Sequence, residues 1–488
     1  MAHREYEQLY IDGKWVHPQS NDVLQVISPS SETVVGRAPD ASPADIDHAV
    51  RAARTAFDAG EWSELGMQQR AKFLQKIAHG VAARGDELSQ VIASESGLPI
   101  KMWARVEPAL LFLDYYLGLA ERYELEELRT GPTSRVLVRH EPVGVVGAIL
   151  PWNSPIGIAF MKLVPALLAG CTVVFKPDPN TPLHACVLAE ICHEAGLPPG
   201  VFNVVPAGRE GSEALVRHPD VDKISFTGST ATGRVIGRLC GEQLKRCTLE
   251  LGGKSAAILL DDVDLSATLP MLAGSAFMNN GEACVLQSRV LAPRSRYDEV
   301  VGALTHAATG MRVGDALDPQ TDVGPMITAA HRDRVEGFIA RGVQEGAQVA
   351  VGGERPDIER GWYVVPTVLA GVDNSMEVAQ QEIFGPVVAV IPYADEREAV
   401  ALANDTSFGL SGTVWTKDHA RGMSIAEKIR TGNYGINTFG MDPCAPFGGR
   451  KESGLGCELG PEGLTEFLDT KSIHLPQDWD ARAYADRR

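Results

Sequence analysis

The sequence predicts an α/β fold with two large domains, each organised around a mainly parallel sheet. The chain has 488 residues, whereas a single hydrophobic core stops growing at about 250–300 residues, so two domains are expected. From residue 143 onward, short apolar and β-branched runs alternate with stretches of helical length, which is the pattern of βαβ units in a doubly wound sheet. A second series of this kind starts near Lys254, so we expect the two domains to meet near residues 250–255.

The first part of the chain is predicted to be helical, and strands become frequent only after residue 143. The ranges 43–59 and 67–94 have the apolar spacing of amphipathic helices and follow capping or turn residues. The range 86–126 continues in the same helical manner. In the first α/β series we expect strands at residues 143–150, 171–175, 202–205 and 223–226, with helices at 158–169, 182–195 and 230–240. In the second series we expect strands at residues 255–260, 288–291, 387–391 and 435–437, with helices at 265–277 and 329–345.

Composition narrows the classes of function. The formal net charge of −18 repels phosphate backbones, so nucleic acid is not an expected partner. The eight cysteines form no Cys-x-x-Cys pair and lie mostly among apolar residues, which favours reduced thiols over a disulfide framework or a metal site. The N-terminus lacks the apolar core of a signal peptide, and the longest uncharged apolar run, residues 163–175, is too short to span a membrane. These features predict a cytoplasmic protein without a membrane segment.

Two short motifs carry the candidates for chemistry. The first, Phe277-Met278-Asn279-Asn280-Gly281-Glu282-Ala283-Cys284, places a cysteine after an apolar helix and a glycine-containing turn, where a thiol can point into a cleft. The second, Glu250-Leu251-Gly252-Gly253-Lys254, holds a carboxylate beside two glycines. Those glycines allow the backbone to pass close to another group, such as a cofactor or the loop that carries the thiol. Each motif also has a structural alternative: Cys284 as a buried thiol, and Glu250 as a helix cap or an ion-pair partner of Lys254.

A third segment is a candidate phosphate site. No Gly-x-Gly-x-x-Gly follows the first strand of the α/β series. Instead, Phe226-Thr227-Gly228-Ser229 ends a strand and Thr230-Ala231-Thr232-Gly233 opens a helix. The free N–H groups and the dipole of a helix N-terminus favour a pyrophosphate. An ordinary Gly-Ser helix cap is the structural alternative.

Seven motifs in this chain together resemble the NAD(P)-dependent aldehyde dehydrogenase superfamily. They occur in the family's order and extend over nearly the whole chain. They are Pro151-Trp152-Asn153, Phe175-Lys176-Pro177, Phe226-Thr227-Gly228-Ser229, Glu250-Leu251-Gly252-Gly253-Lys254, Phe277-x-Asn279-x-Gly281-x-x-Cys284, Glu382-Ile383-Phe384-Gly385-Pro386, and Pro446-Phe447-Gly448-Gly449 with Glu466. Any one of these motifs is weak evidence, whereas seven in order are specific.

The resemblance implies the family's fold and assembly. A Rossmann-type cofactor domain would comprise residues 1–121 and 143–252, and a second α/β catalytic domain residues 253–460. A small oligomerisation arm would comprise residues 122–142 and 472–488, and through it a homodimer or homotetramer is expected. The stretch Arg135-Val136-Leu137-Val138-Arg139 alternates as an exposed strand does, and an exposed edge of this kind seeks a partner.

The resemblance also implies a chemistry, the oxidation of an aldehyde to a carboxylic acid. Cys284 attacks the aldehyde carbon, the adduct passes hydride to the nicotinamide, and a thioester remains. The Asn153 side chain and the backbone N–H of Cys284 stabilise the oxyanion. Glu250 then activates the water that hydrolyses the thioester; the acyl-CoA-forming branch of the family commonly lacks this carboxylate, so its presence favours hydrolysis. Lys162 and Glu466 resemble positions of a proton relay, with solvated charges as the alternative.

NAD is the cofactor that the resemblance implies. The expected contacts are Ile149, Leu150, Pro151, Trp152, Lys176, Phe226, Thr227, Gly228, Ser229, Thr232, Gly233, Leu251, Glu382 and Phe384. Lys176, at the carboxyl end of a parallel strand, would bind the adenosine ribose, with a lone surface lysine as the alternative. Many NAD-using relatives carry a glutamate three residues later, where this chain has Pro179. Because a carboxylate there would repel a 2′-phosphate, its absence leaves NADP open as an alternative cofactor.

Glu282, like Pro179, differs from the residue that the family usually has at its position, which for Glu282 is glutamine. A negative charge two residues before the nucleophile would raise the pKa of the thiol. We therefore expect Glu282→Gln to lower the pKa of Cys284, provided that the carboxylate faces the sulfur.

The substrate tunnel is predicted by position in the matched motifs. Its expected lining is Ser154, Gly157, Ile158, Met161, Ala283, Val285, Met441 and Phe447. These residues are mostly apolar and small or flexible, and none is cationic. They predict a roomy pocket for a bulky apolar aldehyde, whether aliphatic, terpenoid or aromatic, although ordinary core packing explains the same residues.

Two other classes of protein compete with this interpretation. A catalytically inactive, binding member of the same fold would be expected to lack the thiol, the base or the oxyanion amide, and all three are present. A thiol hydrolase could use Cys284 without a nucleotide, whereas Lys176, Ser229 and Glu382 argue for a nucleotide site.

Overall fold

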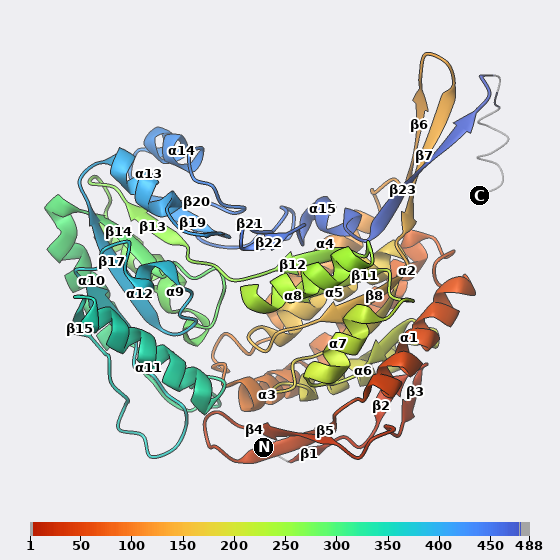
Figure 1. The fold of residues 1–488 in the computed structure, drawn as a ribbon, viewed down its shortest axis with the longest axis horizontal. Helices are drawn as coiled ribbons and strands as arrows, with labels where there is room; N and C mark the ends of the chain where they lie inside the picture. The colour runs from red at the N-terminus through yellow and green to blue at the C-terminus, as the bar shows by residue number, and fades with distance from the viewer. Residues whose placement is uncertain (1–2, 478, 480–488) are drawn as a thin grey trace.

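Two large sheets, each covered by helices on both faces, make up the body of the computed structural model, which describes residues 3–477 and 479 (Figure 1). A three-stranded arm projects from this body, and a small sheet lies near the N-terminus (Figure 1). None of the described helices is long and apolar enough to cross a membrane. The cytoplasmic location stays a prediction.

The first sheet has five parallel strands at its centre. They are β8 (Val145–Ile149), β9 (Thr172–Lys176), β10 (Phe202–Val204), β11 (Lys223–Thr227) and β12 (Arg246–Glu250). Their spatial order is β12-β11-β8-β9-β10, so the order of the chain reverses between β8 and β11. Successive residues of β8 point to opposite cores: Val145 packs into one core and Val146 into the other. Burial on both faces explains the nearly continuous apolar runs of β8 and β9.

Helices cover both faces of the first sheet. On one face lie α1 (Pro43–Asp58), α7 (Arg209–Arg217) and α8 (Thr230–Glu242). On the other lie α5 (Pro155–Ala169) and α6 (Leu183–Glu194), with α2 (Met67–Ala83), α3 (Gly85–Ser96) and α4 (Glu107–Ala120) packed outside them. α5 ends at Gly170, whose φ of +102° closes the helix as the sequence predicts.

The prediction of one continuous helix over residues 67–94 is wrong, because two helices, α2 and α3, meet at Arg84. The helical structure predicted over residues 86–126 is also interrupted. Gly97 ends α3 in the left-handed region with φ +77°, and the chain runs without a regular helix to Glu107. Gly97 followed by Pro99 is a local signal for a helix end, and a Cβ on Gly97 would lie 2.9 Å from Pro325, so a close tertiary contact also requires glycine here.

The second sheet begins immediately after the first one ends. Its parallel strands are β13 (Ala256–Leu259), β14 (Arg289–Pro293), β16 (Thr367–Ala370), β17 (Val387–Tyr393), β19 (Gly412–Trp415) and β20 (Gly435–Ile436), and β15 (Gln348–Val351) pairs antiparallel with β16. Helices α9 (Leu265–Phe277) and α10 (Tyr297–Thr309) cover one face. Helices α11 (Ala329–Gln344), α13 (Glu396–Asn404) and α14 (His419–Ala426) cover the other.

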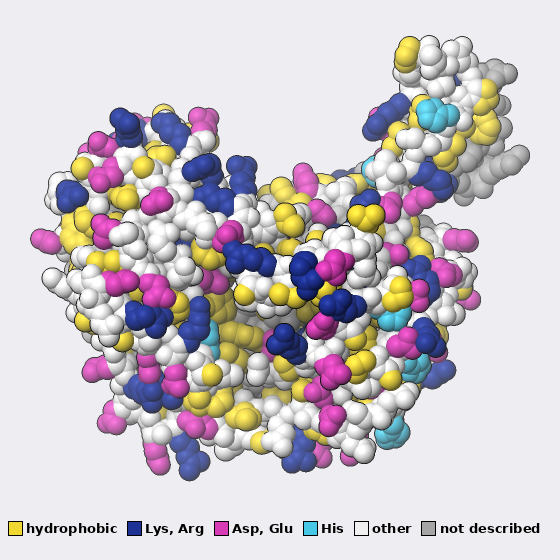
Figure 2. Space-filling view, in the orientation of Figure 1, with side chains coloured by type: hydrophobic (Ala, Val, Ile, Leu, Met, Phe, Trp, Pro, Cys, Tyr) yellow, Lys and Arg dark blue, Asp and Glu magenta, His cyan; other side chains and the backbone are white. Residues whose placement is uncertain are grey.

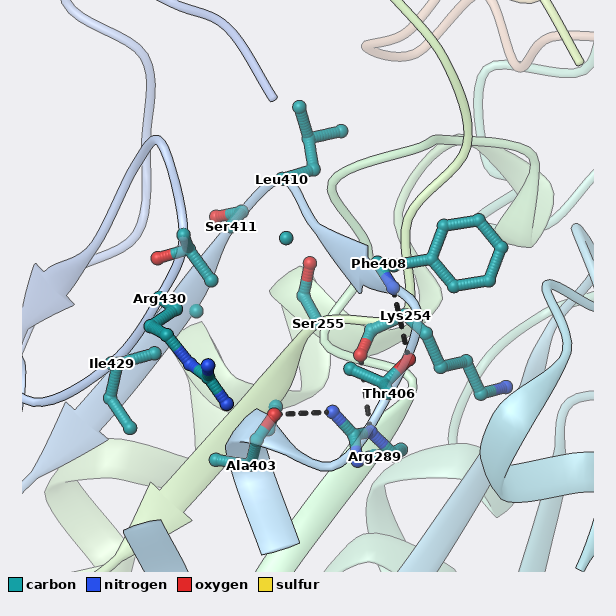
Figure 3. Close-up of a pocket in the computed structure, with 14 residues that line it drawn as sticks. Lys254, Ser255, Arg289, Ala403, Thr406, Phe408, Leu410, Ser411, Ile429 and Arg430 are labelled. Carbon is teal, nitrogen blue, oxygen red and sulfur yellow. Dashed lines mark hydrogen bonds between the residues drawn. The ribbon is translucent and has the colours of Figure 1, made fainter. Parts of the chain in front are cut away.

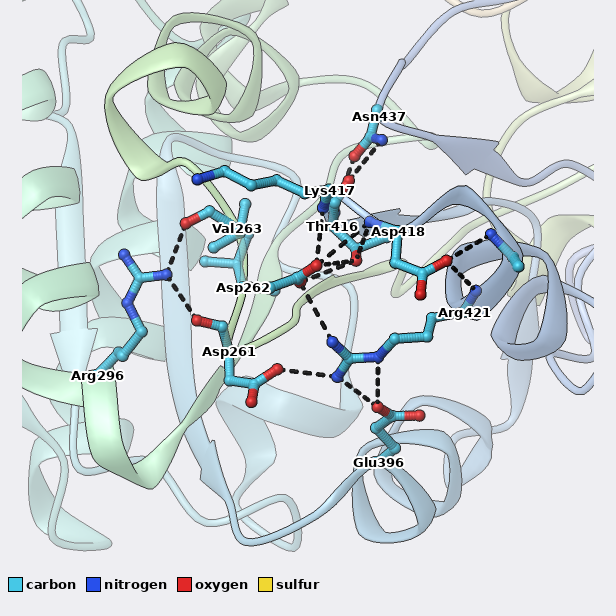
Figure 4. Close-up of polar contacts among 12 residues, drawn as sticks. Asp261, Asp262, Val263, Arg296, Glu396, Thr416, Lys417, Asp418, Arg421 and Asn437 are labelled. Atoms are coloured by element: carbon cyan, nitrogen blue, oxygen red, sulfur yellow. Dashed lines mark hydrogen bonds and ion pairs between the residues drawn. The ribbon is translucent and has the colours of Figure 1, made fainter.

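A network of ion pairs closes the carboxyl end of the second sheet. Asp262, which follows β13, accepts hydrogen bonds from the Thr416 hydroxyl at 2.8 Å and the Lys417 amide at 3.1 Å (Figure 4). Arg421 joins Asp261 at 2.8 Å to Glu396 on α13 (Figure 4). Protein groups satisfy each other at this end, so the amino end of the sheet is the one left to form a site.

Arg289, the first residue of β14, anchors that amino end. Its side chain is 1% exposed, and its guanidinium donates to the carbonyl oxygens of Lys254 at 3.1 Å and Ala403 at 2.9 Å (Figure 3). It also donates to the carbonyl oxygen of Leu402 at 2.9 Å. These hydrogen bonds tie the segment that follows Glu250 to the end of α13. Arg289 therefore fixes the backbone directly after Gly252 and Gly253.

The projecting arm is a three-stranded antiparallel sheet in which β7 (Arg135–Pro142) lies between β6 (Glu126–Thr130) and β23 (Leu468–Leu475). It stands clear of the body (Figure 2). β23 starts at Leu468, four residues before the predicted start of this segment, and residues 478 and 480–488 lie outside the described residues. The chain also returns to the first sheet before residue 460, because β22 (Gly454–Leu455) pairs with β12.

Candidate active site

The site lies where the carboxyl edge of the first sheet meets the amino edge of the second. In open α/β sheets, ligands bind outside the carboxyl ends of the strands where the strand order reverses. Here that point is between β8, which leads into Pro151–Asn153, and β11, which leads into Gly228–Ser229. Glu250 is the last residue of β12, and Cys284 stands on the loop before β14. The topology therefore brings the motifs predicted from the sequence to one place.

A left-handed turn presents the Cys284 loop to the cleft. Asn279, Asn280 and Gly281 have φ values of +55°, +59° and +76°. The Asn280 side chain holds this turn, because its amide donates to Gly97 O at 3.0 Å and its oxygen accepts from the Gly324 N–H at 2.7 Å. A Cβ on Gly281 would lie 2.0 Å from the Gly385 carbonyl carbon. The turn thus needs glycine both for its dihedral angle and for its space.

Gly252 and Gly253 have the close approaches that their motif predicts. A Cβ on Gly253 would lie 2.2 Å from the carbonyl oxygen of Cys284, and one on Gly252 would lie 2.5 Å from Glu382 Oε2. Glu382 Oε1 also accepts the Gly253 N–H at 2.9 Å. The expectation that this backbone passes close to the thiol loop is confirmed, and a close approach to the cofactor stays a prediction.

Asn153 and Asn279 connect the end of β8 to the thiol loop. The Asn153 side-chain amide donates to the Glu282 carbonyl oxygen at 2.7 Å. The Asn279 amide donates to Asn153 O at 2.7 Å and to Glu282 O at 3.0 Å. Both side chains are 6% exposed. Asn153 and Cys284 line the same two cavities, and the oxyanion role of Asn153 stays a prediction. Sequence reasoning missed that Asn279 connects these segments.

Glu250 is 2% exposed, and neither of its carboxylate oxygens has a hydrogen-bond partner among the described residues. The Lys254 ammonium likewise lacks a partner there, so the alternative of a Glu250–Lys254 ion pair is wrong. Burial raises the pKa of Glu250 well above its usual value, and the nearby Glu458 raises it further. A carboxyl group with a raised pKa and free lone pairs is suited to accept a proton from water.

The surroundings of Cys284 raise the pKa of its thiol above the usual value. Burial raises its pKa, and the carboxyl groups of Glu382 and Glu250 add to the effect. Glu282 does not contribute, because its carboxyl group faces away from the sulfur: Oε1 accepts the Ile327 N–H at 3.0 Å and lies 3.7 Å from His331 Nε2. The expectation that Glu282 raises the pKa of the thiol is therefore wrong. Glu282 itself is fully buried, which raises its pKa well above the usual value.

Lys162 is paired, but with a residue that sequence reasoning missed. Its ammonium is fully buried, contacts Glu458 and donates to the Ser225 hydroxyl at 3.3 Å. Glu466 instead accepts from Lys223 at 3.0 Å and Thr248 at 3.1 Å. The alternative of a solvated charge is wrong for Lys162. Its buried neighbour Glu458 comes from the Gly456-Cys457-Glu458-Leu459 segment, ten residues after the Pro446-Phe447-Gly448-Gly449 motif begins.

Two cavities meet at the thiol. The first cavity has a volume of about 230 Å³, and all eight residues predicted for the substrate tunnel line it. The sequence missed further parts of its wall. Most come from the chain around α4 and from the last turns of α3 and α9: Ile92, Met102, Trp103, Arg105, Pro108, Ala109, Phe112 and Met278. Trp103 and Phe112 make the wall more aromatic than predicted. Arg105 adds a cation, which pairs with Glu107 at 3.0 Å.

The second cavity, of about 290 Å³, shares Asn153, Thr227 and Cys284 with the first. Eight predicted cofactor contacts line it: Pro151, Trp152, Thr227, Gly228, Ser229, Leu251, Glu382 and Phe384. Six do not: Ile149, Leu150, Lys176, Phe226, Thr232 and Gly233. The sequence missed His331 and Arg334 of α11, which do line it. Lys176 is not a surface lysine, because it is 4% exposed and donates to Ala207 O at 3.3 Å.

The second cavity fits a nicotinamide dinucleotide. Ser229 caps α8, because its hydroxyl oxygen accepts the Thr232 N–H at 3.2 Å. The predicted alternative of a helix cap is therefore confirmed. Ser229 also lines the cavity, so the N-terminus of α8 faces the cavity as a phosphate site requires. The buried Thr227 hydroxyl has no partner among the described residues. Burial raises the pKa of Glu382 to about 7, and its carboxyl group can accept ribose hydroxyl groups. The ring of Phe384 stands edge-on to Trp152 with centroids 5.5 Å apart and offers an apolar contact.

Comparisons with known proteins agree with this geometry. The model of the aldehyde dehydrogenase family matches residues 15–473. Geranial dehydrogenase of Castellaniella defragrans is 48% identical over 474 residues, which are 96% of this chain and 99% of that protein. The 3-succinoylsemialdehyde-pyridine dehydrogenase of a Pseudomonas species is 40% identical over 476 residues, 96% of this chain and 98% of that protein.

Solved structures extend the likeness to the fold. An aldehyde dehydrogenase of Mycobacterium tuberculosis complexed with NAD⁺ superposes with a TM-score of 0.97 at 48% identity, over 98% of this chain and 100% of that one. A mutant of aldehyde dehydrogenase C from Pseudomonas syringae, complexed with NAD⁺ and octanal, superposes with a TM-score of 0.92 at 40% identity, over 96% of each chain. The chain therefore belongs to the aldehyde dehydrogenase family and is an NAD-dependent oxidoreductase that acts on aldehydes.

Proposed function

We propose that this protein oxidises a bulky apolar aldehyde to the free carboxylic acid, with Cys284 as nucleophile and Glu250 as the base that activates water. One observation carries the proposal. The thiol stands at the junction of an apolar tunnel and a polar groove, with Asn153 beside it and Glu250 on the tunnel wall. An aldehyde in the tunnel and a hydride acceptor in the groove would meet at the sulfur.

In the first half of the reaction, the Cys284 thiol gives its proton to water, and the resulting thiolate adds to the aldehyde carbon. The carbonyl oxygen becomes an oxyanion, which the Asn153 amide and the Cys284 N–H stabilise; one such donor typically contributes ~10²–10³ in rate. The tetrahedral carbon then loses its hydrogen as hydride and becomes a thioester carbon. Bound NAD supplies the acceptor for this hydride.

In the second half, water adds to the thioester carbon while one of its protons passes to Glu250. Collapse of this adduct breaks the carbon–sulfur bond, releases the acid and restores the thiolate. The raised pKa of Glu250 supports this role, because a base with a pKa near the working pH accepts a proton most effectively. The buried Lys162–Glu458 pair, whose charges act on Glu250, is placed to pass the proton onward.

The tunnel supports an apolar substrate. Its walls are formed by aromatic rings and by the methionines Met102, Met161, Met278 and Met441, and a methionine side chain adapts to irregular apolar shapes. The cation at the wall, Arg105, is already neutralised by Glu107. Two similar proteins, a geranial dehydrogenase and an aldehyde dehydrogenase whose structure contains octanal, support aliphatic or terpenoid aldehydes as substrates.

Two carboxylates support a preference for NAD over NADP despite Pro179. Asp40 accepts the Gly208 N–H at 2.8 Å, beside the Ala207 carbonyl that binds Lys176. Asp40 and Asp178 both act electrostatically on the Lys176 ammonium. With one cation between two carboxylates, this end of β9 would repel a 2′-phosphate as a glutamate at position 179 would.

The arm supports assembly into a homodimer or homotetramer. Its outer strands β6 and β23 are sheet edges in the described chain, and edges of this length are usually covered by a partner. Light scattering coupled to size exclusion measures the mass, and a monomer at micromolar concentration would contradict this part of the proposal.

The reaction is tested with purified protein, a panel of aliphatic, terpenoid and aromatic aldehydes, and NAD against NADP. Nicotinamide absorbance reports turnover, and chromatography identifies the acid. An inactive binding protein of this fold would take up NAD without turnover. A thiol hydrolase would cleave esters and ignore the cofactor. Turnover that survives Cys284→Ala would overturn the proposal.

A further inference from the structure

We propose that His331 and Arg334, on the first turns of α11, are positioning residues that hold the cofactor-contact loop 382–384 in its binding conformation. The inference rests on the proposed function only in that this loop meets the nicotinamide half of NAD. His331 Nε2 donates to the Phe384 carbonyl oxygen at 2.6 Å, and Arg334 Nη2 donates to the Glu382 carbonyl oxygen at 2.7 Å. Arg334 Nη1 donates to the carbonyl oxygen between them, that of Ile383. Three successive carbonyl groups are thus bound by two side chains of one helix.

The loop needs such support because its backbone is unfavourable. Phe384 has φ +60°, a region that residues with a Cβ adopt rarely and that a bulky residue adopts only when the surroundings impose it. The hydrogen bonds from α11 reach the oxygen atoms on either side of this residue. Without them, the loop would relax to an extended conformation and move both the Phe384 ring and the Glu382 carboxyl group.

The two residues that hold the loop, His331 and Arg334, are here called the clamp, and other side chains fix their positions. Thr328 caps α11 and accepts the His331 N–H at 3.1 Å, which fixes the turn that carries the imidazole. The guanidinium of Arg334 stacks over the Phe338 ring with a distance of 4.8 Å to its centroid. His331 also stands edge-on to Trp152, with ring centroids 5.7 Å apart. Trp152 belongs to the segment after β8, so His331 joins α11 of the second sheet to the first.

The protonation of His331 suits this role. Burial lowers the pKa of His331 to about 4, so the imidazole is neutral near pH 7. Because the Phe384 oxygen can only accept a hydrogen bond, the single ring proton is assigned to Nε2. Neutral imidazole makes a directed hydrogen bond here without placing a positive charge on the wall of the second cavity, which would hold the positively charged nicotinamide of NAD⁺.

The loop is held at its other end by the site itself, because Glu382 Oε1 accepts the Gly253 N–H at 2.9 Å. Gly253 lies against the carbonyl oxygen of Cys284. The clamp on α11 therefore sets where the cofactor contacts lie relative to the nucleophile, while no atom of His331 needs to touch a reacting atom. Its loss should weaken NAD binding and hydride transfer, and should spare the chemistry of Cys284 that needs no cofactor.

The test compares His331→Leu, which removes the donor, with His331→Gln, which keeps an N–H of similar reach. The dissociation constant for NAD is measured by calorimetry, which needs no turnover, and the rate of p-nitrophenyl acetate hydrolysis without cofactor reports on Cys284. We expect His331→Leu to raise the dissociation constant by roughly tenfold and to raise the KM for NAD, while ester hydrolysis changes little. His331→Gln should restore most of the affinity.

Arg334→Met is the second variant, and it should weaken NAD binding in the same way without the imidazole being touched. Arg341→Gln is the matched control, because it removes an ion pair with Glu377 elsewhere on α11. Unchanged NAD affinity in both His331→Leu and Arg334→Met would overturn the inference. So would a parallel loss of ester hydrolysis, which would indicate a merely structural role. Wild-type protein that binds NAD but oxidises no aldehyde would refute the proposed function and leave the clamp testable by calorimetry.

Discussion

The side-chain amide of Asn153 donates to the carbonyl oxygen of Glu282 across 2.7 Å. This hydrogen bond crosses from the end of a strand in the first sheet to the loop that carries Cys284 in the second. It orients the amide that would stabilise an oxyanion at the thiol. Asn279 binds the carbonyl groups of both residues, so the donor and the nucleophile are positioned by one small network.

Asn153→Ala is expected to lower kcat for aldehyde oxidation by ~10²–10³, because one oxyanion donor is lost. Asn279→Ala should lower it less, since that amide acts through its neighbours. Steady-state kinetics with a saturating aldehyde measures both variants, and NAD affinity serves as the control. The oxyanion role would be ruled out by an Asn153→Ala enzyme with the wild-type kcat.

Glu250→Gln is expected to have opposite effects on turnover and on thiol reactivity. Steady-state oxidation should fall by ~10²–10⁴, the usual contribution of a general base. Alkylation of Cys284 by iodoacetamide should become faster at neutral to mildly alkaline pH. At the pH where the thiol ionises, Glu250 is itself a carboxylate and opposes the second negative charge, so its removal lowers the pKa of Cys284.

The pH profile of alkylation checks the effect of Glu250→Gln, and Cys284→Ala identifies the residue that is alkylated. A profile that does not move, or one that moves to higher pH, would contradict the electrostatic argument. A loss of both activities would instead indicate damage to the fold.

Glu282→Gln is expected to leave that alkylation profile unchanged, because the carboxyl group faces Ile327 and not the sulfur. It should change the pH dependence of stability. The folded-state pKa of Glu282 is raised above its unfolded value, so its contribution is fully present below the unfolded pKa and is lost as pH rises through the folded pKa. The difference in Tm between Glu282→Gln and the wild type should therefore shift in favour of the variant as the pH rises from 5 into the alkaline range. A constant difference in Tm would refute the burial of a neutral carboxyl group.

Gly157→Ala is expected to discriminate against bulky aldehydes. A Cβ at this position would lie 2.6 Å from Ser154 Oγ on the tunnel wall, so the added methyl group narrows the space available to substrate. The kcat/KM for a branched or long aldehyde should fall by roughly tenfold or more, and that for propanal should change little. Gly118→Ala on α4, where nothing lies within 4 Å, is the matched control. An equal loss for all aldehydes would place the substrate elsewhere.

Asp40→Asn combined with Asp178→Asn is expected to shift cofactor preference toward NADP. Removing two negative charges near Lys176 reduces the repulsion of a 2′-phosphate. The ratio of kcat/KM for NADP to that for NAD should rise by roughly tenfold, the equivalent of about 1.4 kcal/mol. Asp298→Asn, an exposed position on α10, should leave the ratio unchanged. No change in the double variant would assign the preference to other residues.

Much of the fold was predictable because its signals are local. Buried parallel strands read as short apolar runs, and Gly170 marks a helix end by its left-handed dihedral angle. The break at Gly97 was missed because apolar residues at helical spacing continue across it, although Gly97 and Pro99 mark a helix end locally. The carboxyl-terminal return of β22 to the first sheet was missed for a similar reason, since a two-residue strand has no periodicity to detect.

The sequence by itself predicted the candidate reactive groups of this protein: Cys284 on a glycine turn, Glu250 before two glycines and, through the family resemblance, Asn153 after a buried strand. The motifs of Cys284 and Glu250 could be found because glycine is needed where chains approach closely. Only the tertiary structure decided which charges act on the thiol, namely Glu382 and Glu250 and not the neighbouring Glu282. It also decided that Lys162 pairs with Glu458 and that His331 of α11 holds the Phe384 loop. Side-chain direction and long-range neighbours depend on how two sheets pack together, which no local pattern encodes.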